Sequence, residues 1–279
     1  MLLDGLKVAN ERNEKLKLQI EKDLSLGIKA PSSAIILVGN DPASQIYVRS
    51  KVKAAKKVGI NSQLIELDEN IKEEELELII NNLNNDNNVD GILLQLPLPK
   101  HLNENKFINL INSNKDIDGF TLINQGKLFQ REKTINAATP QGIMNLLNHY
   151  KINVSGLNAV VIGRSQIVGL PMAKLLLDAN ATVTVCHSRT KDLKQYTKNA
   201  DLIVVAVGSP KMLTSDMVKE GVIIIDVGIN RLNEKLVGDV DFDNVYNKAS
   251  YITPVPKGVG PMTINALLEN IYKVSKINR

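Results

Sequence analysis

The chain has 279 residues, 43% hydrophobic and 23% charged, which is typical of a folded globular protein with one large or two modest domains. Its net charge is only +4, and six tyrosines, four phenylalanines and no tryptophan leave few rings for stacking bases, so no nucleic-acid partner is expected. One cysteine, Cys186, excludes an intrachain disulfide and favours the cytoplasm, and no apolar run approaches the roughly eighteen residues that span a membrane.

The first half of the chain predicts three strands separated by helices. The strands are expected at Ala34–Gly39, Ser62–Leu67 and Val89–Leu94. Short apolar runs that alternate with amphipathic helical patterns are typical of parallel sheets covered by helices, so the predicted class is α/β. A helix start is indicated by Asp41 and Pro42, a cap and a first-turn residue, and Gly59 is expected to stop that helix.

This helix carries the first candidate site. Tyr47 and Lys51 are four residues apart, so they share one face, where a ring and an amine can hold a flat ligand and move a proton. Val48, Val52 and Ala55 are expected to form the neighbouring stripe that faces the core. Spacing alone leaves open an exposed tyrosine beside a solvated lysine.

Two polar side chains near the third strand are further candidates. Gln95 directly follows the apolar run that ends at Leu94, and α/β sheets bind ligands at the carboxyl ends of their strands. Asp118 precedes Gly119 in a turn sequence. Taken singly, Gln95 also fits a loop amide and Asp118 a turn or helix cap.

A second α/β series is predicted after Thr139-Pro140, which indicates a helix start. Four buried strands are expected at Ala159–Ile162, Thr182–Val185, Leu202–Val205 and Val222–Asp226. Together with the helices between them they form a nucleotide-binding half-fold. Residues 253–263 are so rich in proline and glycine that we expect a shaped loop there, followed by a last helix over 264–277 that packs on the first domain.

The turn after the strand ending at Ile162 is a candidate phosphate site. Gly163, Arg164 and Ser165 stand between that strand and a helix, where backbone N–H groups can face a pyrophosphate. The sequence departs from G-x-G-x-x-G, because Ser165 and Val168 occupy the second and third glycine positions. A plain strand-to-helix turn therefore remains an alternative.

The end of the next strand indicates which cofactor is bound. NAD sites place an acid there for the ribose 2′-OH, whereas this chain has Cys186, His187, Ser188 and Arg189. Ser188 and Arg189, with Arg164, can hold a 2′-phosphate, which points to NADP. Cys186 and His187 are expected to be packed strand-end residues, and no histidine has metal-ligand spacing, so no metal is predicted.

Read together, these segments resemble the bifunctional methylenetetrahydrofolate dehydrogenase/methenyltetrahydrofolate cyclohydrolase family, known in bacteria as FolD. The matching motifs run in order along nearly the whole chain: Asp41-Pro42-Ala43-Ser44, Tyr47-Val48-x-x-Lys51, Gln95-Leu96-Pro97-Leu98-Pro99, Lys115-Asp116-Ile117-Asp118-Gly119-Phe120, Gly163-Arg164-Ser165, Asp226-Val227-Gly228-Ile229-Asn230, Gly238-Asp239-Val240 and Gly258-Val259-Gly260-Pro261-Met262-Thr263. The resemblance implies a folate-binding catalytic domain, residues 1–138 completed by helix 264–279. It also implies a Rossmann-type NADP domain over 139–263, a folate cleft where the domains meet, and a homodimer.

The resemblance also assigns residues to these sites. It implies that Tyr47, Lys51, Gln95 and Asp118 line the folate site with Gly260 and Pro261, that Gly163, Arg164, Ser165, Ser188 and Arg189 hold NADP, and that Ile229 lies near the nicotinamide. The chain departs from the family at Ala138, where the family often has cysteine. It departs again at Lys257, where the family usually has glycine; a lysine held there at positive φ would cost about 1 kcal/mol.

The implied chemistry has two steps. A hydride passes from 5,10-methylenetetrahydrofolate to NADP⁺, and water then converts the methenyl product to 10-formyltetrahydrofolate. Lys51, its pKa lowered by desolvation, is the expected proton carrier. Gln95 is expected to orient Lys51 or to polarise the reacting atoms, while Tyr47 packs on the aminobenzoate and Asp118 binds the pterin. Two alternatives remain, a cofactor-binding protein without turnover and an NADP dehydrogenase for a small carbonyl compound.

Overall fold

The computed structural model of the chain describes residues 1–233 and 235–277. The contacts between residues divide the chain into two compact units. One contains Met1–Asn10 and Thr139–Ala266, and we call it the 139–266 unit. The other contains Glu11–Ala138 and Leu267–Arg279, and we call it the 11–138 unit. Both contain parallel sheets, as the predicted α/β class requires.

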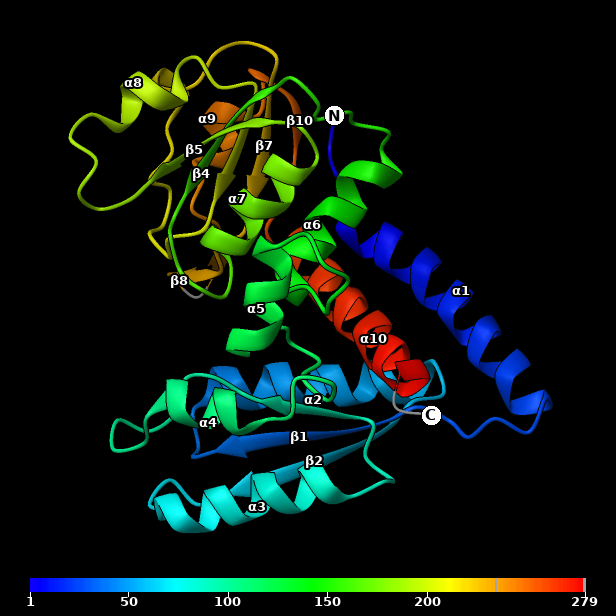
Figure 1. Cartoon of the computed structure of the whole chain (residues 1–279). Helices are drawn as coiled ribbons and strands as arrows, with labels where there is room; N and C mark the ends of the chain where they lie inside the picture. The colour runs from blue at the N-terminus through cyan, green and yellow to red at the C-terminus, as the bar shows by residue number, and fades with distance from the viewer. Residues whose placement is uncertain (234, 278–279) are drawn as a thin grey trace. The chain divides into compact units, whose positions relative to one another are not determined.

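The 11–138 unit is built on a three-stranded parallel sheet in the order β2-β1-β3. The strands are β1 (Ser32–Val38), β2 (Asn61–Leu67) and β3 (Gly91–Leu94), and the helices are α2 (Pro42–Lys57), α3 (Glu73–Asn85), α4 (Glu104–Leu110) and α5 (Leu122–Phe129). Helices α2 and α3 lie on opposite faces of the sheet (Figure 1). The alternate residues Ala34, Ile36 and Val38 of β1 are buried in the cluster that contains Leu76 and Phe107, so this face of the central strand packs in an apolar core.

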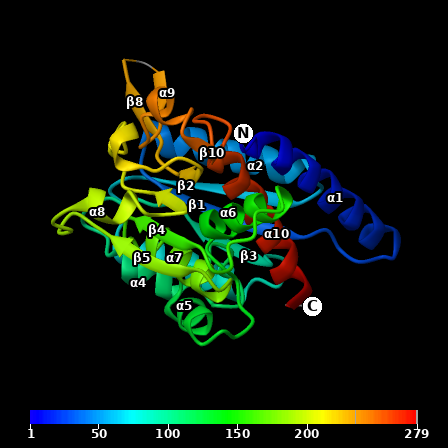
Figure 2. The same ribbon diagram turned by 90° about the horizontal axis from the view of Figure 1, so that it is seen from above.

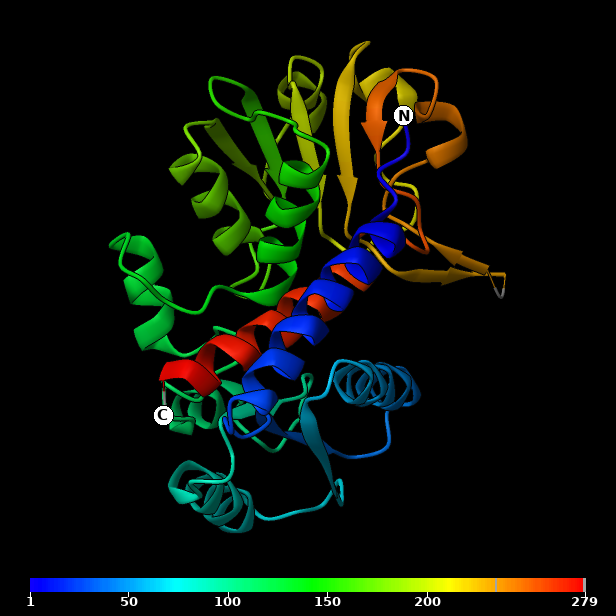
Figure 3. The same ribbon diagram turned by 90° about the vertical axis from the view of Figure 1, so that its right-hand side faces the viewer.

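Two long helices, α1 (Gly5–Ser25) and α10 (Val259–Ile277), contribute their later residues to the 11–138 unit. They lie side by side (Figures 2 and 3), and two polar clusters join them. Arg12 donates from Nε to Glu269 at 2.9 Å. Asp23 accepts a hydrogen bond from the Tyr272 hydroxyl at 2.7 Å and pairs with Lys276 at 2.6 Å. Helix α1 was not among the predicted elements.

The 139–266 unit is built on a five-stranded parallel sheet in the order β10-β7-β6-β4-β5. Its strands are β4 (Asn158–Ile162), β5 (Thr182–Cys186), β6 (Leu202–Val205), β7 (Val222–Asp226) and β10 (Ala249–Ile252), and its helical segments are α6 (Ala138–His149), α7 (Gly169–Asp178), α8 (Leu193–Thr197), η1 (Ser215–Met217) and α9 (Phe242–Val245). An antiparallel hairpin, β8 (Asn230–Leu232) and β9 (Lys235–Val237), extends away from this sheet (Figure 3). The sheet separates two apolar clusters, one on each face.

Three expectations need correction here. The sheet has a fifth strand, β10, and β5 is only partly buried because it is an edge strand. The last helix starts at Val259 rather than Ile264, so the shaped loop is shorter than expected. Pro261 is tolerated in the first turn because a residue there has no intrahelical acceptor for its N–H group.

No helix among the described residues is long and apolar enough to cross a membrane.

Candidate active site

Helix α2 carries Lys51 into the interior of the 11–138 unit. The helix starts as predicted, with the Asp41 carboxylate accepting a hydrogen bond from the Ser44 backbone N–H at 2.8 Å. Its buried residues are Ser44, Val48, Lys51 and Ala55. Val52, which was expected on the core stripe, is only half-buried. Lys51 occupies the stripe itself, because residues seven apart, such as Ser44 and Lys51, return to the same side of a helix.

Lys51 has a defined polar environment although it is only 5% exposed. Its Nζ donates a hydrogen bond to Gln95 Oε1 at 3.0 Å and lies 4.7 Å from the centre of the Tyr47 ring. The Gln95 amide donates in turn to the Leu96 carbonyl at 2.7 Å, which fixes the direction of Oε1. Burial lowers the pKa of Lys51, and the negative charge of Asp118 acts against that change. The site therefore holds an amine that can lose its proton more readily than a surface lysine.

Asp118 is the fourth member of this group. Burial raises its pKa to about 6, Lys51 opposes that rise and the neighbouring Asp116 adds to it. The segment that carries it runs parallel to β3, through a bridge between Asp116 and Ile92. Gln95 directly follows β3, so the fold brings Gln95 and Asp118 close to each other and to Lys51.

The turn that holds Asp118 is organised by Asp116, a residue that sequence reasoning did not single out. Asp116 is buried, and its carboxylate accepts hydrogen bonds from the backbone N–H groups of Gly119 and Thr121, each at 2.8 Å. Asn124 donates to the same carboxylate at 2.9 Å. Gly119 has a φ of +70°, and a Cβ there would lie 2.5 Å from the Ile135 carbonyl oxygen, so glycine is required. In the sequence, only the spacing Asp116-x-Asp118 could have indicated that one aspartate holds the turn while the other belongs to the candidate site.

The candidate cofactor residues lie at the carboxyl edge of the five-stranded sheet. Ile162, the last residue of β4, pairs with Cys186 of β5 on one side and Val205 of β6 on the other. All five strands are parallel, and the order in which they join the sheet reverses at β4, with β5 on one side and β6, β7 and β10 on the other. Parallel sheets bind ligands at such switch points. Gly163 follows with a φ of +124°, and a Cβ on it would lie 2.5 Å from the Ala206 carbonyl oxygen.

The side chains around this turn suit an anionic ligand. The Ser165 hydroxyl accepts hydrogen bonds from the N–H groups of Val168 and Gly169, at 3.2 and 3.3 Å, and so caps α7. Arg164, Ser188 and Arg189 are exposed, and the turn after β5 contains no acid. Positive charge without a carboxylate at this strand end fits NADP better than NAD.

Two buried carboxylates, which the sequence prediction missed, hold the loops after β6 and β7. Asp239 accepts hydrogen bonds from the Val207 and Gly208 N–H groups at 2.8 and 2.9 Å and from the Asn230 side chain at 2.9 Å. Asp226 accepts from the N–H groups of Asp239 and Val240, at 2.9 and 3.0 Å. Burial raises the pKa of Asp226 to about 7, against these hydrogen bonds. These hydrogen bonds join the segments 226–230 and 238–240 to each other.

Ile229, Gly260 and Pro261 line one pocket of about 230 Å³ in the 139–266 unit. Ile229 is 62% exposed and, with Val227, gives this pocket part of its apolar wall. Lys257 also lines this pocket, and its φ of +82° lies in the left-handed region. The backbone strain expected for a lysine at positive φ therefore applies.

The structure thus groups the predicted residues by unit. Tyr47, Lys51, Gln95 and Asp118 come together in the 11–138 unit. The cofactor candidates Gly163, Arg164, Ser165, Ser188 and Arg189, together with Ile229, Gly260 and Pro261, belong to the 139–266 unit.

Comparison with known proteins identifies the family. Residues 3–118 match the model of the tetrahydrofolate dehydrogenase/cyclohydrolase catalytic domain, and residues 137–279 match that of its NAD(P)-binding domain. The bifunctional protein FolD of Acholeplasma laidlawii is 53% identical over 272 residues, covering 98% of this chain and 97% of the relative.

Solved structures agree. The bifunctional FolD dehydrogenase/cyclohydrolase of Campylobacter jejuni superposes with a TM-score of 0.98 at 53% identity, covering 100% of this chain and 99% of that one. A FolD of Trypanosoma brucei, solved with NADP cofactor and inhibitor, has a TM-score of 0.95 at 35% identity, covering 99% and 97% of the two chains. The two alternatives, a binding protein without turnover and a small-carbonyl dehydrogenase, are therefore not favoured. The chain belongs to the tetrahydrofolate dehydrogenase/cyclohydrolase family and is a bifunctional enzyme of that family.

Proposed function

We propose that Lys51 is the proton carrier of the cyclohydrolase step in this enzyme. The enzyme oxidises 5,10-methylenetetrahydrofolate with NADP⁺ and hydrolyses the methenyl product to 10-formyltetrahydrofolate. The observation that carries the assignment is the buried Lys51 amine, hydrogen-bonded to Gln95 at 3.0 Å and lying near Asp118.

The second reaction is the one that needs a protein base. Water adds to the cationic methenyl carbon and loses one proton, which leaves a hydroxyl on that carbon. As the ring opens, the hydroxyl loses a second proton while a folate nitrogen gains one, so one proton is released overall. Lys51 as a neutral amine accepts the first proton and as an ammonium returns one. Burial lowers the pKa of Lys51, which favours the neutral form that can accept a proton.

The neighbouring side chains have distinct roles in this proposal. Gln95, anchored on the Leu96 carbonyl, holds the Lys51 amine in one direction. Tyr47 offers its ring face to the flat aminobenzoate. Asp118 as a carboxylate accepts hydrogen bonds from the pterin amino and ring N–H groups.

In the first reaction, bound NADP⁺ would supply the acceptor for the hydride that leaves the methylene carbon. The folate nitrogens stabilise the cation that forms, so the protein mainly binds and orients the two reactants. Two observations support the proposed NADP site. Gly163 has no side chain where the backbone would approach the pyrophosphate. Arg164, Ser188 and Arg189 are exposed and can reach a phosphate. The apolar pocket of Ile229, Gly260 and Pro261 is proposed to receive the nicotinamide and part of the substrate.

We also infer a homodimer in the cytoplasm. The family resemblance supports the dimer, and the single cysteine supports a reducing compartment. We further propose that the 11–138 unit supplies the residues of the folate chemistry and that the 139–266 unit binds the cofactor.

A coupled assay tests the function directly. Purified protein is mixed with 5,10-methylenetetrahydrofolate and NADP⁺, and the absorbances of NADPH and of the methenyl compound are followed together. We expect NADPH to accumulate, and added methenyltetrahydrofolate to be consumed in a separate reaction without cofactor. Absence of both activities in the folded protein would favour the cofactor-binding protein without turnover.

A further inference from the structure

The 11–138 unit contains a second pocket, of about 440 Å³, between α5, the segment after it and the end of α10. Four lysines line it, namely Lys127, Lys133, Lys273 and Lys276, and none of its described lining residues is acidic. The residues of the proposed folate site, Tyr47, Lys51, Gln95 and Asp118, are not among the lining residues. This pocket is therefore a separate, positively charged site.

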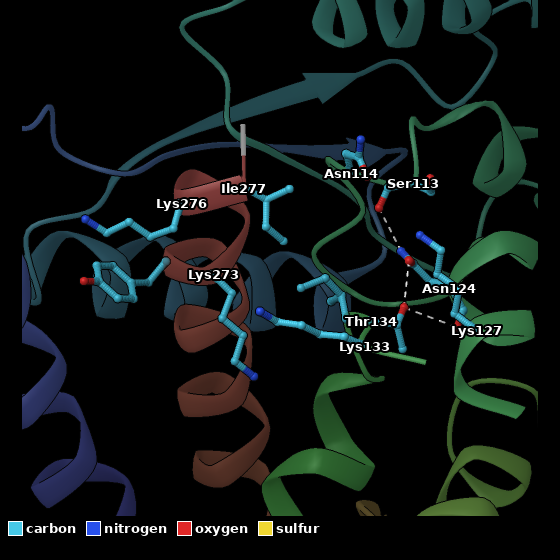
Figure 4. A pocket seen from close by; sticks show the side chains of 11 residues that line it. Ser113, Asn114, Asn124, Lys127, Lys133, Thr134, Lys273, Lys276 and Ile277 are labelled. Carbon is cyan, nitrogen blue, oxygen red and sulfur yellow. Dashed lines mark hydrogen bonds between the residues drawn. The ribbon is translucent and has the colours of Figure 1, made fainter. Parts of the chain in front are cut away.

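The four lysines are not equivalent. Lys276 pairs with Asp23 at 2.6 Å, and in Figure 4 its side chain points away from the others. Lys133 and Lys273 extend toward the same space from two different segments (Figure 4). Among the described residues, Lys127, Lys133 and Lys273 have no hydrogen-bond or ion-pair partner. Three lysines without a hydrogen-bond or ion-pair partner thus line one pocket, and the side chains of two of them, Lys133 and Lys273, approach each other.

The surroundings of Lys273 disfavour its positive charge. Burial lowers its pKa, and Arg12 lowers it further, while Glu269 opposes them. Glu269 is already engaged with Arg12 at 2.8 Å, so it does not neutralise Lys273 on its own. A bound anion would oppose this lowering of the Lys273 pKa, because a negative charge favours the protonated amine.

The polar wall of the pocket is already ordered. The Thr134 hydroxyl donates to Asn124 Oδ1 at 2.8 Å, and the Asn124 amide donates to the Ser113 carbonyl at 2.9 Å. Because these groups satisfy one another, recognition by the pocket rests on the ammonium groups. Ammonium groups are point charges that suit multiply charged oxygens rather than planar, bidentate partners.

We propose that this pocket binds a small, multiply charged oxyanion, a phosphate compound or a polycarboxylate, through Lys127, Lys133 and Lys273. The volume limits the ligand to a small molecule. Several lysines and no acid among the described lining residues favour a ligand with more than one negative charge.

Calorimetric titration tests the proposal, with inorganic pyrophosphate in one arm and tricarballylate in the other. Saturating NADP⁺ is present, so that the cofactor site does not contribute, and ionic strength is held constant. We expect saturable binding of one anion per chain, and the tighter arm identifies the class of ligand. The variant K133Q/K273Q should bind about tenfold to a hundredfold more weakly, since each lost charged contact is worth about tenfold.

The control variant is K15Q/K57Q, which removes the same charge from two exposed lysines of α1 and α2 outside the pocket. It should bind like the parent protein. No saturable binding in either arm, or equal binding by the pocket and control variants, would overturn the proposal.

Discussion

Lys51 and Asp118 share one environment, and burial shifts their pKa values in opposite directions. Burial lowers the pKa of Lys51 and raises that of Asp118 to about 6, while each charge partly offsets the effect on the other. The spacing of Tyr47 and Lys51 could be predicted from the sequence. The burial of Lys51 could not, because it depends on which stripe of α2 packs against the sheet.

A pH profile tests the role of Asp118. Its carboxylate must be charged to accept hydrogen bonds from the pterin, so kcat/KM should fall as the pH decreases through about 6. In D118N this limb should disappear, and kcat/KM should be lower throughout by about tenfold or more, because one charged hydrogen-bond acceptor is lost. The measurement is cyclohydrolase kcat/KM between pH 5 and pH 8. Persistence of the same limb in D118N would assign it to another group.

Cofactor choice is also decided by single residues. Arg164 and Arg189 are exposed near the carboxyl edge of the sheet, and the end of β5 has no acid. Replacing both arginines with alanine should raise the KM for NADP⁺ about tenfold or more, since charged hydrogen bonds to the 2′-phosphate are lost. The KM for NAD⁺, which lacks that phosphate, should change little. An equal loss for both cofactors, or equal kcat/KM for both in the parent protein, would contradict the assignment.

Most strands could be located from the sequence because β-branched runs are bounded by turn residues. β6 and β7 have the predicted bounds, and β4 and β5 each differ by one residue. The start of α10 could not be located in this way. Glycine and proline at 258–261 suggested a loop, yet the first turn of a helix accepts both residues.

Lys257, two residues before the start of this helix, tests the cost of backbone strain. Its φ of +82° is unfavourable for a residue with a Cβ, so K257G should stabilise the protein, although the freer unfolded chain offsets part of the gain. We expect a net gain of up to about 1 kcal/mol in the free energy of unfolding by chemical denaturation. K257A, which keeps the Cβ, is the control and should show no gain. A loss of stability in K257G would mean that the lysine side chain itself contributes.

At the scale of the whole molecule, the positions of Asp116, Asp226 and Asp239 were beyond sequence reasoning. Each carboxylate binds backbone N–H groups of loops, as Asp239 does at Val207, thirty-two residues away. These hydrogen bonds between distant segments depend on the order of the strands in the sheet, which cannot be read from a single sequence. The candidate site residues could still be predicted, because they lie in long motifs that match the family.

Assembly is a property of the molecule that the resemblance predicts. Among the described strands, β5 is an edge strand of its sheet with no strand on its outer side, and such an edge is available to a second copy. Sedimentation equilibrium at micromolar concentration should give about twice the 30.7 kDa of one chain. A single species at 30.7 kDa would rule out the dimer.

The central claim is that Lys51 moves protons in the hydrolysis and is not obligatory for hydride transfer. The most direct measurement compares both activities in K51M, which keeps most of the side-chain volume and removes the amine. Cyclohydrolase activity should fall by about 10²- to 10⁴-fold, the usual contribution of a positioned acid or base, while dehydrogenase activity stays measurable and methenyltetrahydrofolate accumulates. Hydrolysis of saturating methenyltetrahydrofolate by K51M at the parental rate would contradict the account.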